Sequence, residues 1–128
     1  MRIKQFFKLL PLLLFSTLSH ANVQQVAPHV LLELIENNQA PFILDVRTAE
    51  EFQQGHIKGA VNISHDLLEN STELFKIKKE QPIVVYCRSG RRAQIAYKIL
   101  DKKGYKQLVD LQGHMILWQQ NRFPLEYE

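Results

Sequence analysis

The sequence predicts an α/β domain with a largely parallel central sheet and helices on both of its faces. Short apolar segments alternate along the chain with segments whose apolar residues recur at helical spacing. The connections between these segments are mostly short, as in sheets built from consecutive strand–helix–strand units. Residues 41–46 are almost continuously apolar, which is typical of a strand covered on both faces.

Local patterns define the individual elements of this domain. Residues 22–27 are expected to form a short entry segment. The apolar segments predict strands at residues 41–46, 60–63, 82–87 and 107–111. Apolar spacing, caps and breakers predict helices from Pro28 to Asn37, after the capping box Thr48–Glu51, within 65–70 and 71–79 as one or two helices, over 93–103 up to Gly104, and after Gly113.

The chemistry is expected at residues 82–93, where an apolar strand ends at Cys87. A loop of Arg88, Ser89, Gly90, Arg91 and Arg92 follows, and a helix begins directly after it. The N-terminus of a helix presents unpaired backbone N–H groups and a partial positive charge, so this arrangement is suited to bind an anion. Asp45 and Arg47 lie at the end of the strand predicted at residues 41–46 and are expected at the same edge of the sheet.

Cys87 is predicted to be a reactive thiol. Cationic neighbours at a helix start lower a cysteine pKa to roughly 3.5–7.5, which makes the thiolate the main form at neutral pH. A buried structural cysteine is the alternative, because free cysteines are among the most buried residues. That alternative accounts for the apolar strand but not for the arginines and the glycine that follow Cys87.

The net charge of +3 does not predict nucleic-acid binding. Three of the sixteen basic residues lie within the first eight positions, and without them basic and acidic residues are balanced at 13 each. Residues 1–21 have the features of a secretory signal peptide: basic residues, a short apolar stretch and a small residue, Ala21, at the expected cleavage site. We therefore expect export to the periplasm, cleavage after Ala21, and a mature domain of residues 22–128 that is not held in the membrane.

A single cysteine excludes an internal disulfide. An exported domain stabilised by disulfides would have an even number of cysteines. A lone thiol in an oxidising compartment is exposed to mixed-disulfide formation, which is easier to understand if the thiol has a function.

Three motifs in the expected order resemble those of rhodanese domains. The first two cover residues 44–63 and the Cys87 loop at residues 84–93. The third includes Gly113, Trp118 and Pro124. Together they span most of residues 26–125, and the whole resembles a single-domain, exported rhodanese of the thiosulfate sulfurtransferase type.

This resemblance implies a sulfurtransferase without a metal or organic cofactor. Cys87 would take a sulfane sulfur from a donor such as thiosulfate, hold it as a persulfide, and pass it to cyanide or a thiol. The loop from Arg88 to Arg92 would bind the persulfide and the anionic donor. Independently of the resemblance, Asp45 and Arg47 could bind substrate, but we expect them to be scaffold near the site. Arg47 would pair with Glu50 or Glu51, and Asp45 would bond to the backbone near the loop.

One residue departs from the family pattern at the third motif. Rhodanese domains often have a second glycine where this chain has His114, directly after Gly113. This histidine could narrow or polarise the rim of the pocket, or act as a general acid/base near the thiol. The histidines show no metal-ligand spacing with each other or with Cys87, so a metal site is not expected.

Two other functions compete with sulfur transfer to a small molecule. Cysteine-dependent phosphatases and arsenate reductases of related fold also use a cysteine in an anion-binding loop. The arginine that phosphatases place at the end of that loop would fall at position 93, which is Ala93 here, one residue after Arg92. The other alternative is a persulfide relay module that exchanges sulfur with a partner protein.

Overall fold

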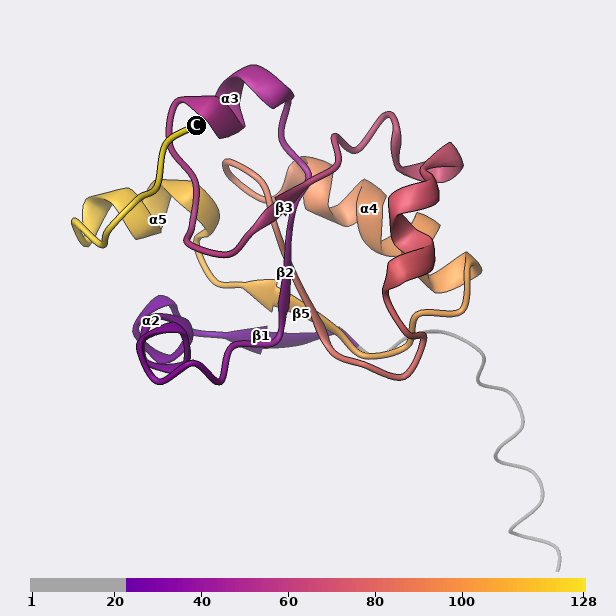
Figure 1. Cartoon of the computed structure of the whole chain (residues 1–128), viewed down its shortest axis with the longest axis horizontal. Helices are drawn as coiled ribbons and strands as arrows, with labels where there is room; N and C mark the ends of the chain where they lie inside the picture. The colour runs from indigo at the N-terminus through magenta and orange to yellow at the C-terminus, as the bar shows by residue number, and fades with distance from the viewer. Residues whose placement is uncertain (1–22) are drawn as a thin grey trace, which may run out of the picture.

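The computed structural model describes residues 23–128, and the predicted signal peptide lies outside the described residues. A five-stranded sheet, with every pair of neighbours parallel, forms the centre of the domain (Figure 1). Its strands are, in spatial order, β1 (Gln24–Val26), β5 (Leu108–Leu111), β4 (Ile83–Tyr86), β2 (Phe42–Asp45) and β3 (Val61–Asn62). The predicted α/β class is confirmed.

Helices cover both faces of this sheet. On one face lie α2 (Pro28–Glu36) and α5 (His114–Gln120), and on the other lies α4 (Arg91–Lys102), as Figure 1 shows. The second face is completed by two short 3₁₀ helices, η2 (Leu68–Asn70) and η3 (Thr72–Lys76). A further helix, α3 (Ala49–Gln53), follows β2.

Strand β4 shows why two helical layers are needed. Val84 and Tyr86 belong to the core beneath α2 and α5, whereas Ile83 and Val85 belong to the core beneath α4. All four residues of the strand are buried. Because successive side chains of a strand point to opposite faces, this apolar run stabilises the domain only if both faces are covered.

The N-terminal entry segment contains a strand that was not predicted from the sequence. Gln24, Gln25 and Val26 form β1 and pair in parallel with Val109, Asp110 and Leu111 of β5. The strand lies at the edge of the sheet and its residues are exposed or half-buried. Two consecutive glutamines give no apolar alternation, so backbone pairing defines this strand.

The segment between β3 and β4 also differs from the prediction. In place of α-helices within 65–79 it contains the two 3₁₀ helices η2 and η3. Each contributes one buried leucine, Leu68 or Leu74, while Phe75 is exposed. Because each segment buries only one leucine, neither has the apolar stripe that a longer helix would bury.

Outside the segment between β3 and β4, the predicted helices are present, and the start of α4 is shifted. The capping box of α3 is present, with Thr48 accepting from the backbone of Glu51 and Glu51 accepting from the backbone of Thr48. Helix α4 begins at Arg91, two residues before the predicted start at Ala93, and Gly104 follows its end with a φ of +99°. The apolar pattern begins only at Ala93, which explains the late predicted start.

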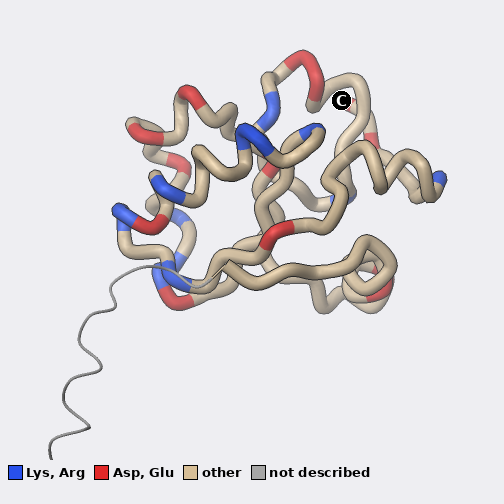
Figure 2. Tube along the Cα trace, turned by 180° about the vertical axis from the view of Figure 1, so that it is seen from behind, with Lys and Arg blue, Asp and Glu red and all other residues tan. Residues whose placement is uncertain are grey.

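Charged residues of both signs are interspersed along the trace (Figure 2). Among residues 23–128, no helix has the length and apolar character needed to cross a membrane.

Candidate active site

Cys87 lies where β4 ends and the loop to α4 begins. The register of the sheet pairs Asp45, the last residue of β2, with Tyr86, the residue before Cys87. The expected meeting of Asp45 and Cys87 at the carboxyl edge of the sheet is therefore confirmed. This is the edge where parallel α/β sheets bind their ligands.

The sulfur of Cys87 is buried and still bears the features of a reactive group. The residue is 1% exposed, and its Sγ accepts a hydrogen bond from the backbone N–H of Gly90 at 3.0 Å. Two carbonyls of the loop are fixed in turn by the start of α5: Met115 N–H donates to Cys87 O, and Ile116 N–H donates to Arg88 O. The start of α5 thus fixes the loop, and the N–H of Gly90 is directed at the sulfur.

The charge of this thiol is set by opposing effects. Burial raises the pKa of Cys87. Hydrogen bonds from the His114 side chain and from the backbone N–H groups of Ala93 and Gly90 lower it by more than burial raises it, so the pKa falls to about 7. A substantial thiolate population at neutral pH is thus supported. The leading causes of the lowering are a histidine and backbone amides, whereas the prediction from sequence relied on the arginines at the helix start.

Gly90 makes the loop conformation accessible. Its φ is +120°, a region that residues with a Cβ rarely adopt. A Cβ there would also lie 3.2 Å from Nε2 of His114. Glycine thus permits both the turn that directs an N–H at sulfur and the close approach of the imidazole.

Replacing Gly90 with alanine is expected to destabilise the domain by about 1–3 kcal/mol through backbone strain. It is also expected to slow alkylation of Cys87, because the N–H donor and His114 are both displaced. Urea unfolding and the rate of reaction with iodoacetamide measure the two effects. Gly59→Ala is the matched control, since Gly59 also has a positive φ of +84° but open space around a Cβ. Equal alkylation rates in the two variants would contradict this account of Gly90.

The arginines of the loop have different environments. Arg92 forms a bidentate pair with Glu51, with Nη1–Oε1 at 2.7 Å and Nη2–Oε2 at 3.0 Å. Its hydrogen bond is the main cause that lowers the pKa of Glu51 to about 2. Arg88 and Arg91 are exposed, as is Ser89, and within residues 23–128 the two arginines form no ion pair. These two cations are therefore available to an anion from solvent.

Asp45 and Arg47 form a buried pair, and the predicted pairing of Arg47 with Glu50 or Glu51 is wrong. Arg47 Nη2 lies 2.6 Å from Asp45 Oδ2, with side-chain exposures of 6% and 0%. The same Nη2 donates to Gly55 O at 2.9 Å, and the guanidinium lies 5.5 Å from the centroid of the Tyr86 ring. Glu51 pairs instead with Arg92, a residue distant in sequence. Asp45 and Arg47 thus connect β2 to the glycine turn beneath the site.

His114 is the residue whose importance sequence reasoning underestimated. It is 5% exposed, and its Nδ1 accepts from the backbone N–H of Cys87 at 3.1 Å. Its Nε2 lies 3.1 Å from Asp110 Oδ1. The only sequence evidence was the departure at this position, where a second glycine was expected.

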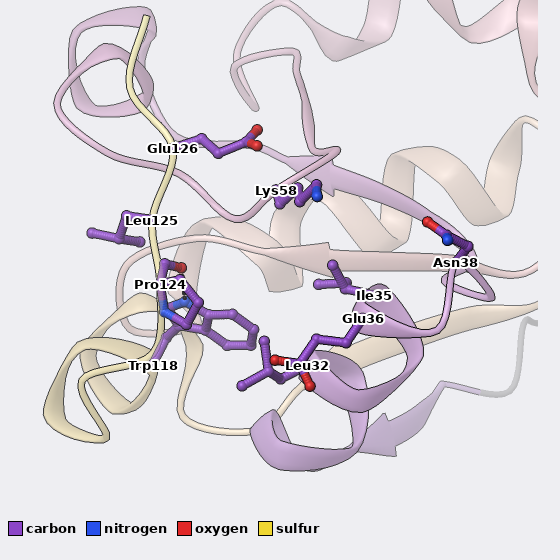
Figure 3. Close-up of a pocket in the computed structure, with 9 residues that line it drawn as sticks. All are labelled: Leu32, Ile35, Glu36, Asn38, Lys58, Trp118, Pro124, Leu125 and Glu126. Carbon is purple, nitrogen blue, oxygen red and sulfur yellow. Dashed lines mark hydrogen bonds between the residues drawn. The ribbon is translucent and has the colours of Figure 1, made fainter.

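A pocket of about 530 Å³ lies away from this site (Figure 3). It is bordered by residues of α2, α5 and the C-terminal segment, including Leu32, Trp118 and Leu125. Trp118 is a core residue, as predicted, and its Nε1 donates to Pro124 O at 2.9 Å. The lining contains none of the residues predicted to act on sulfur. Among residues 23–128, no group of three or more histidine, cysteine, aspartate or glutamate side chains could hold a metal ion.

Comparison with known proteins identifies the family. The model of the rhodanese-like domain matches residues 27–121. The chain belongs to the rhodanese-like domain family. A sulfurtransferase of Allochromatium vinosum is 28% identical to this rhodanese-like domain over 103 residues, which cover 80% of the chain and 94% of the relative. A rhodanese-related protein from Thermoplasma volcanium has a similar structure, with a TM-score of 0.68, 26% identity, and coverage of 82% of this chain and 99% of that one.

Some relatives are much longer than this chain. The adenylyltransferase and sulfurtransferase uba4 of Ogataea parapolymorpha is 32% identical over 103 residues, but the match covers only 26% of that protein. The rhodanese-like domain matches a part of it, and two of these three relatives are named as sulfurtransferases. Family membership and these relatives support sulfur transfer as the general chemistry.

Proposed function

We propose that this rhodanese-like domain moves a sulfane sulfur from thiosulfate or a related anionic donor to cyanide or a thiol, through a persulfide on Cys87. The observation that supports this most strongly is the position of the Cys87 sulfur, which accepts a loop N–H where α4 begins. A thiolate is the nucleophile in such chemistry, and a negatively charged sulfur is stabilised by donors fixed in advance around it.

The first half-reaction follows from this arrangement. The Cys87 thiolate attacks the outer sulfur of thiosulfate, a new S–S bond forms, and the S–S bond of the donor breaks. Sulfite leaves with the electron pair, and the negative charge moves to the terminal sulfur of the persulfide. The exposed Arg88 and Arg91 would draw the dianionic donor to the loop, while Arg92 remains bound to Glu51. The residues assigned to donor and persulfide binding are those of the loop: Arg88, Ser89, Gly90, Arg91 and Arg92.

The second half-reaction returns the enzyme to its starting state. Cyanide or a thiolate attacks the terminal sulfur, the persulfide bond breaks, and the electron pair returns to the Cys87 sulfur as thiolate. Thiocyanate or a new persulfide is the product. Every step involves one sulfur atom and one electron pair, so the scheme requires no metal and no organic cofactor.

A steady-state assay separates this proposal from a phosphatase. We expect turnover of thiosulfate and cyanide to thiocyanate, and no hydrolysis of an aryl phosphate under the same conditions. The loop is one residue too short to end in the arginine of phosphatases, because position 93 is Ala93. Hydrolysis of the phosphate without thiocyanate formation would reverse the assignment.

A protein acceptor is a second candidate for the sulfur. It is favoured by uba4, in whose name sulfurtransferase is joined to adenylyltransferase and in which the matched domain is a part of a longer chain. A persulfide that passes much faster to a protein thiol than to cyanide would support this relay. Capture of the partner with a Cys87→Ser variant would name it.

Action in the periplasm is also part of the proposal. It is supported by the basic residues and the short apolar stretch that precede Ala21. N-terminal sequencing of the protein from the producing cell tests it, with Asn22 as the expected first residue. An N-terminus that retains residues 1–21 would contradict export with cleavage.

A further inference from the structure

A line of three polar side chains runs behind Cys87, each from a different element. Tyr97 of α4 donates its hydroxyl to Asp110 Oδ1, and Asp110 of β5 lies 3.1 Å from His114 Nε2. His114, the first residue of α5, contacts the backbone N–H of Cys87 through Nδ1 at 3.1 Å. The side chains of His114 and Asp110 are 6% and 13% exposed, so solvent does little to weaken their interaction.

His114 has a backbone conformation that is energetically unfavourable for a residue with a Cβ. Its φ is +52°, in the left-handed region that non-glycine residues seldom occupy. The ring lies against Gly90, where a Cβ would approach Nε2 to 3.2 Å. The next residue, Met115, donates its N–H to Cys87 O at 3.1 Å. A strained backbone conformation that is held by surrounding contacts often occurs at a functional position.

The two ring nitrogens have different partners, which fixes where protons can go. Nε2 faces the carboxylate of Asp110 and holds a proton in the neutral ring. Nδ1 then accepts from Cys87 N–H. A second proton can be added only at Nδ1, the nitrogen that faces Cys87, and the protonated ring must then exchange that accepted bond for donation toward a negative sulfur.

We propose that His114 is the residue that sets the charge on the sulfur at position 87, its imidazolium stabilising first the thiolate and then the persulfide anion. Asp110 and Tyr97 are positioning residues, because they act on the sulfur only through the ring. The persulfide part rests on the proposed function. The thiolate part holds for any reaction of Cys87.

The protonation behaviour of the pair agrees with this role. Burial lowers the pKa of His114, but the hydrogen bonds to Asp110 and Cys87 raise it more, to about 9. The pKa of Cys87 falls to about 7. Between these values the thiolate and the imidazolium coexist as a pair. Below them the thiol is protonated, and above them the histidine is neutral.

The other groups around the pair do not change charge near neutrality. From α4, Tyr97 has a raised pKa because of burial and Asp110, and Arg92 has a raised pKa because of Glu51. Burial raises the pKa of Asp110 on β5, but bonds from His114 and Tyr97 lower it below its ordinary value. Glu51 of α3 remains ionised, and Gln25 of β1 is an uncharged partner of Asp110. Titration near neutrality therefore reports on Cys87 and His114.

Alkylation of the only thiol over a range of pH tests the proposal. His114→Asn is the informative variant, because asparagine tolerates a positive φ and can still accept from Cys87 N–H but cannot become a cation. We expect its thiol pKa to rise by about one unit or more, so that alkylation below pH 7 slows about tenfold or more. Asp110→Asn is expected to shift the profile in the same direction. His29→Asn, the same change at an exposed histidine of α2, should match the wild type.

A second variant and a second measurement keep the test informative if His114→Asn does not fold. His114→Gly suits the left-handed backbone and should give the same shift. In the unmutated protein, NMR titration of the His114 ring before and after alkylation of Cys87 should show a fall in the histidine pKa, because the thiolate is removed. Unchanged alkylation profiles in both folded variants, or an unchanged histidine titration, would overturn the proposal. Failure of sulfur loading with a shifted profile would instead count against the proposed function alone.

Discussion

Cys87→Ser is expected to abolish sulfur transfer, with thiocyanate formation falling to the rate without enzyme. A serine hydroxyl keeps the size of the side chain but does not ionise near neutrality, and the thiolate is the attacking species. The chain has one cysteine, so no other thiol can take its place. The measurement is steady-state turnover of thiosulfate and cyanide by wild type and variant at equal concentration.

The control for this prediction is stability. Sγ of Cys87 accepts from Gly90 N–H at 3.0 Å, and a serine oxygen can accept the same bond. The unfolding midpoint in urea should therefore stay close to that of the wild type. Turnover that persists in a folded Cys87→Ser variant would mean that sulfur is carried elsewhere, and the assignment of Cys87 as nucleophile would fail.

Breaking the pair between Asp45 and Arg47 is expected to have the largest effect on stability. Removing one partner of a buried ion pair leaves an uncompensated charge and costs about 3–5 kcal/mol. The pair is almost fully buried, with Nη2–Oδ2 at 2.6 Å. Asp45→Ala and Arg47→Met should each lower the free energy of unfolding by about that amount, a large part of the ~5–15 kcal/mol typical of a domain.

A double variant and an exposed pair make this prediction specific. The cost of Asp45→Ala/Arg47→Met together should be clearly less than the sum of the single costs, because neither charge remains unpaired. The exposed pair Lys76–Glu73, with side-chain exposures of 75% and 54%, is the control. Lys76→Met should cost less than about 1 kcal/mol. Additive costs at Asp45 and Arg47 would contradict their description as a coupled buried pair.

The fold was largely predictable because its main elements have strong local patterns. Apolar runs define β2 and β4, and the reciprocal bonds of Thr48 and Glu51 define the start of α3. The parts that were missed lack such patterns. Strand β1 has two glutamines and depends on pairing with β5, and the 3₁₀ segments η2 and η3 each bury a single leucine.

The site was predictable in its nucleophile but not in its electrostatics. The strand, the loop and the helix start around Cys87 are local in sequence, so their chemistry follows from residues 82–93. The partner of Glu51 is Arg92, and the partner of Cys87 is His114, both brought close only by the sheet. Closeness in sequence led to the predictions that Glu51 pairs with Arg47 and that the loop arginines lower the pKa of Cys87. In the folded domain, tertiary contacts pair Glu51 with Arg92 and bring His114 to Cys87.

The central claim is that Cys87 carries sulfur, and an intact mass after incubation with thiosulfate tests it most directly. The wild-type domain should gain the mass of one sulfur atom, and Cys87→Ser should gain nothing. Addition of cyanide should remove the gain and release thiocyanate. A sulfur atom that binds equally to Cys87→Ser would contradict the claim. So would a wild-type protein that alkylates readily at Cys87 but accepts no sulfur from thiosulfate or from a persulfide donor.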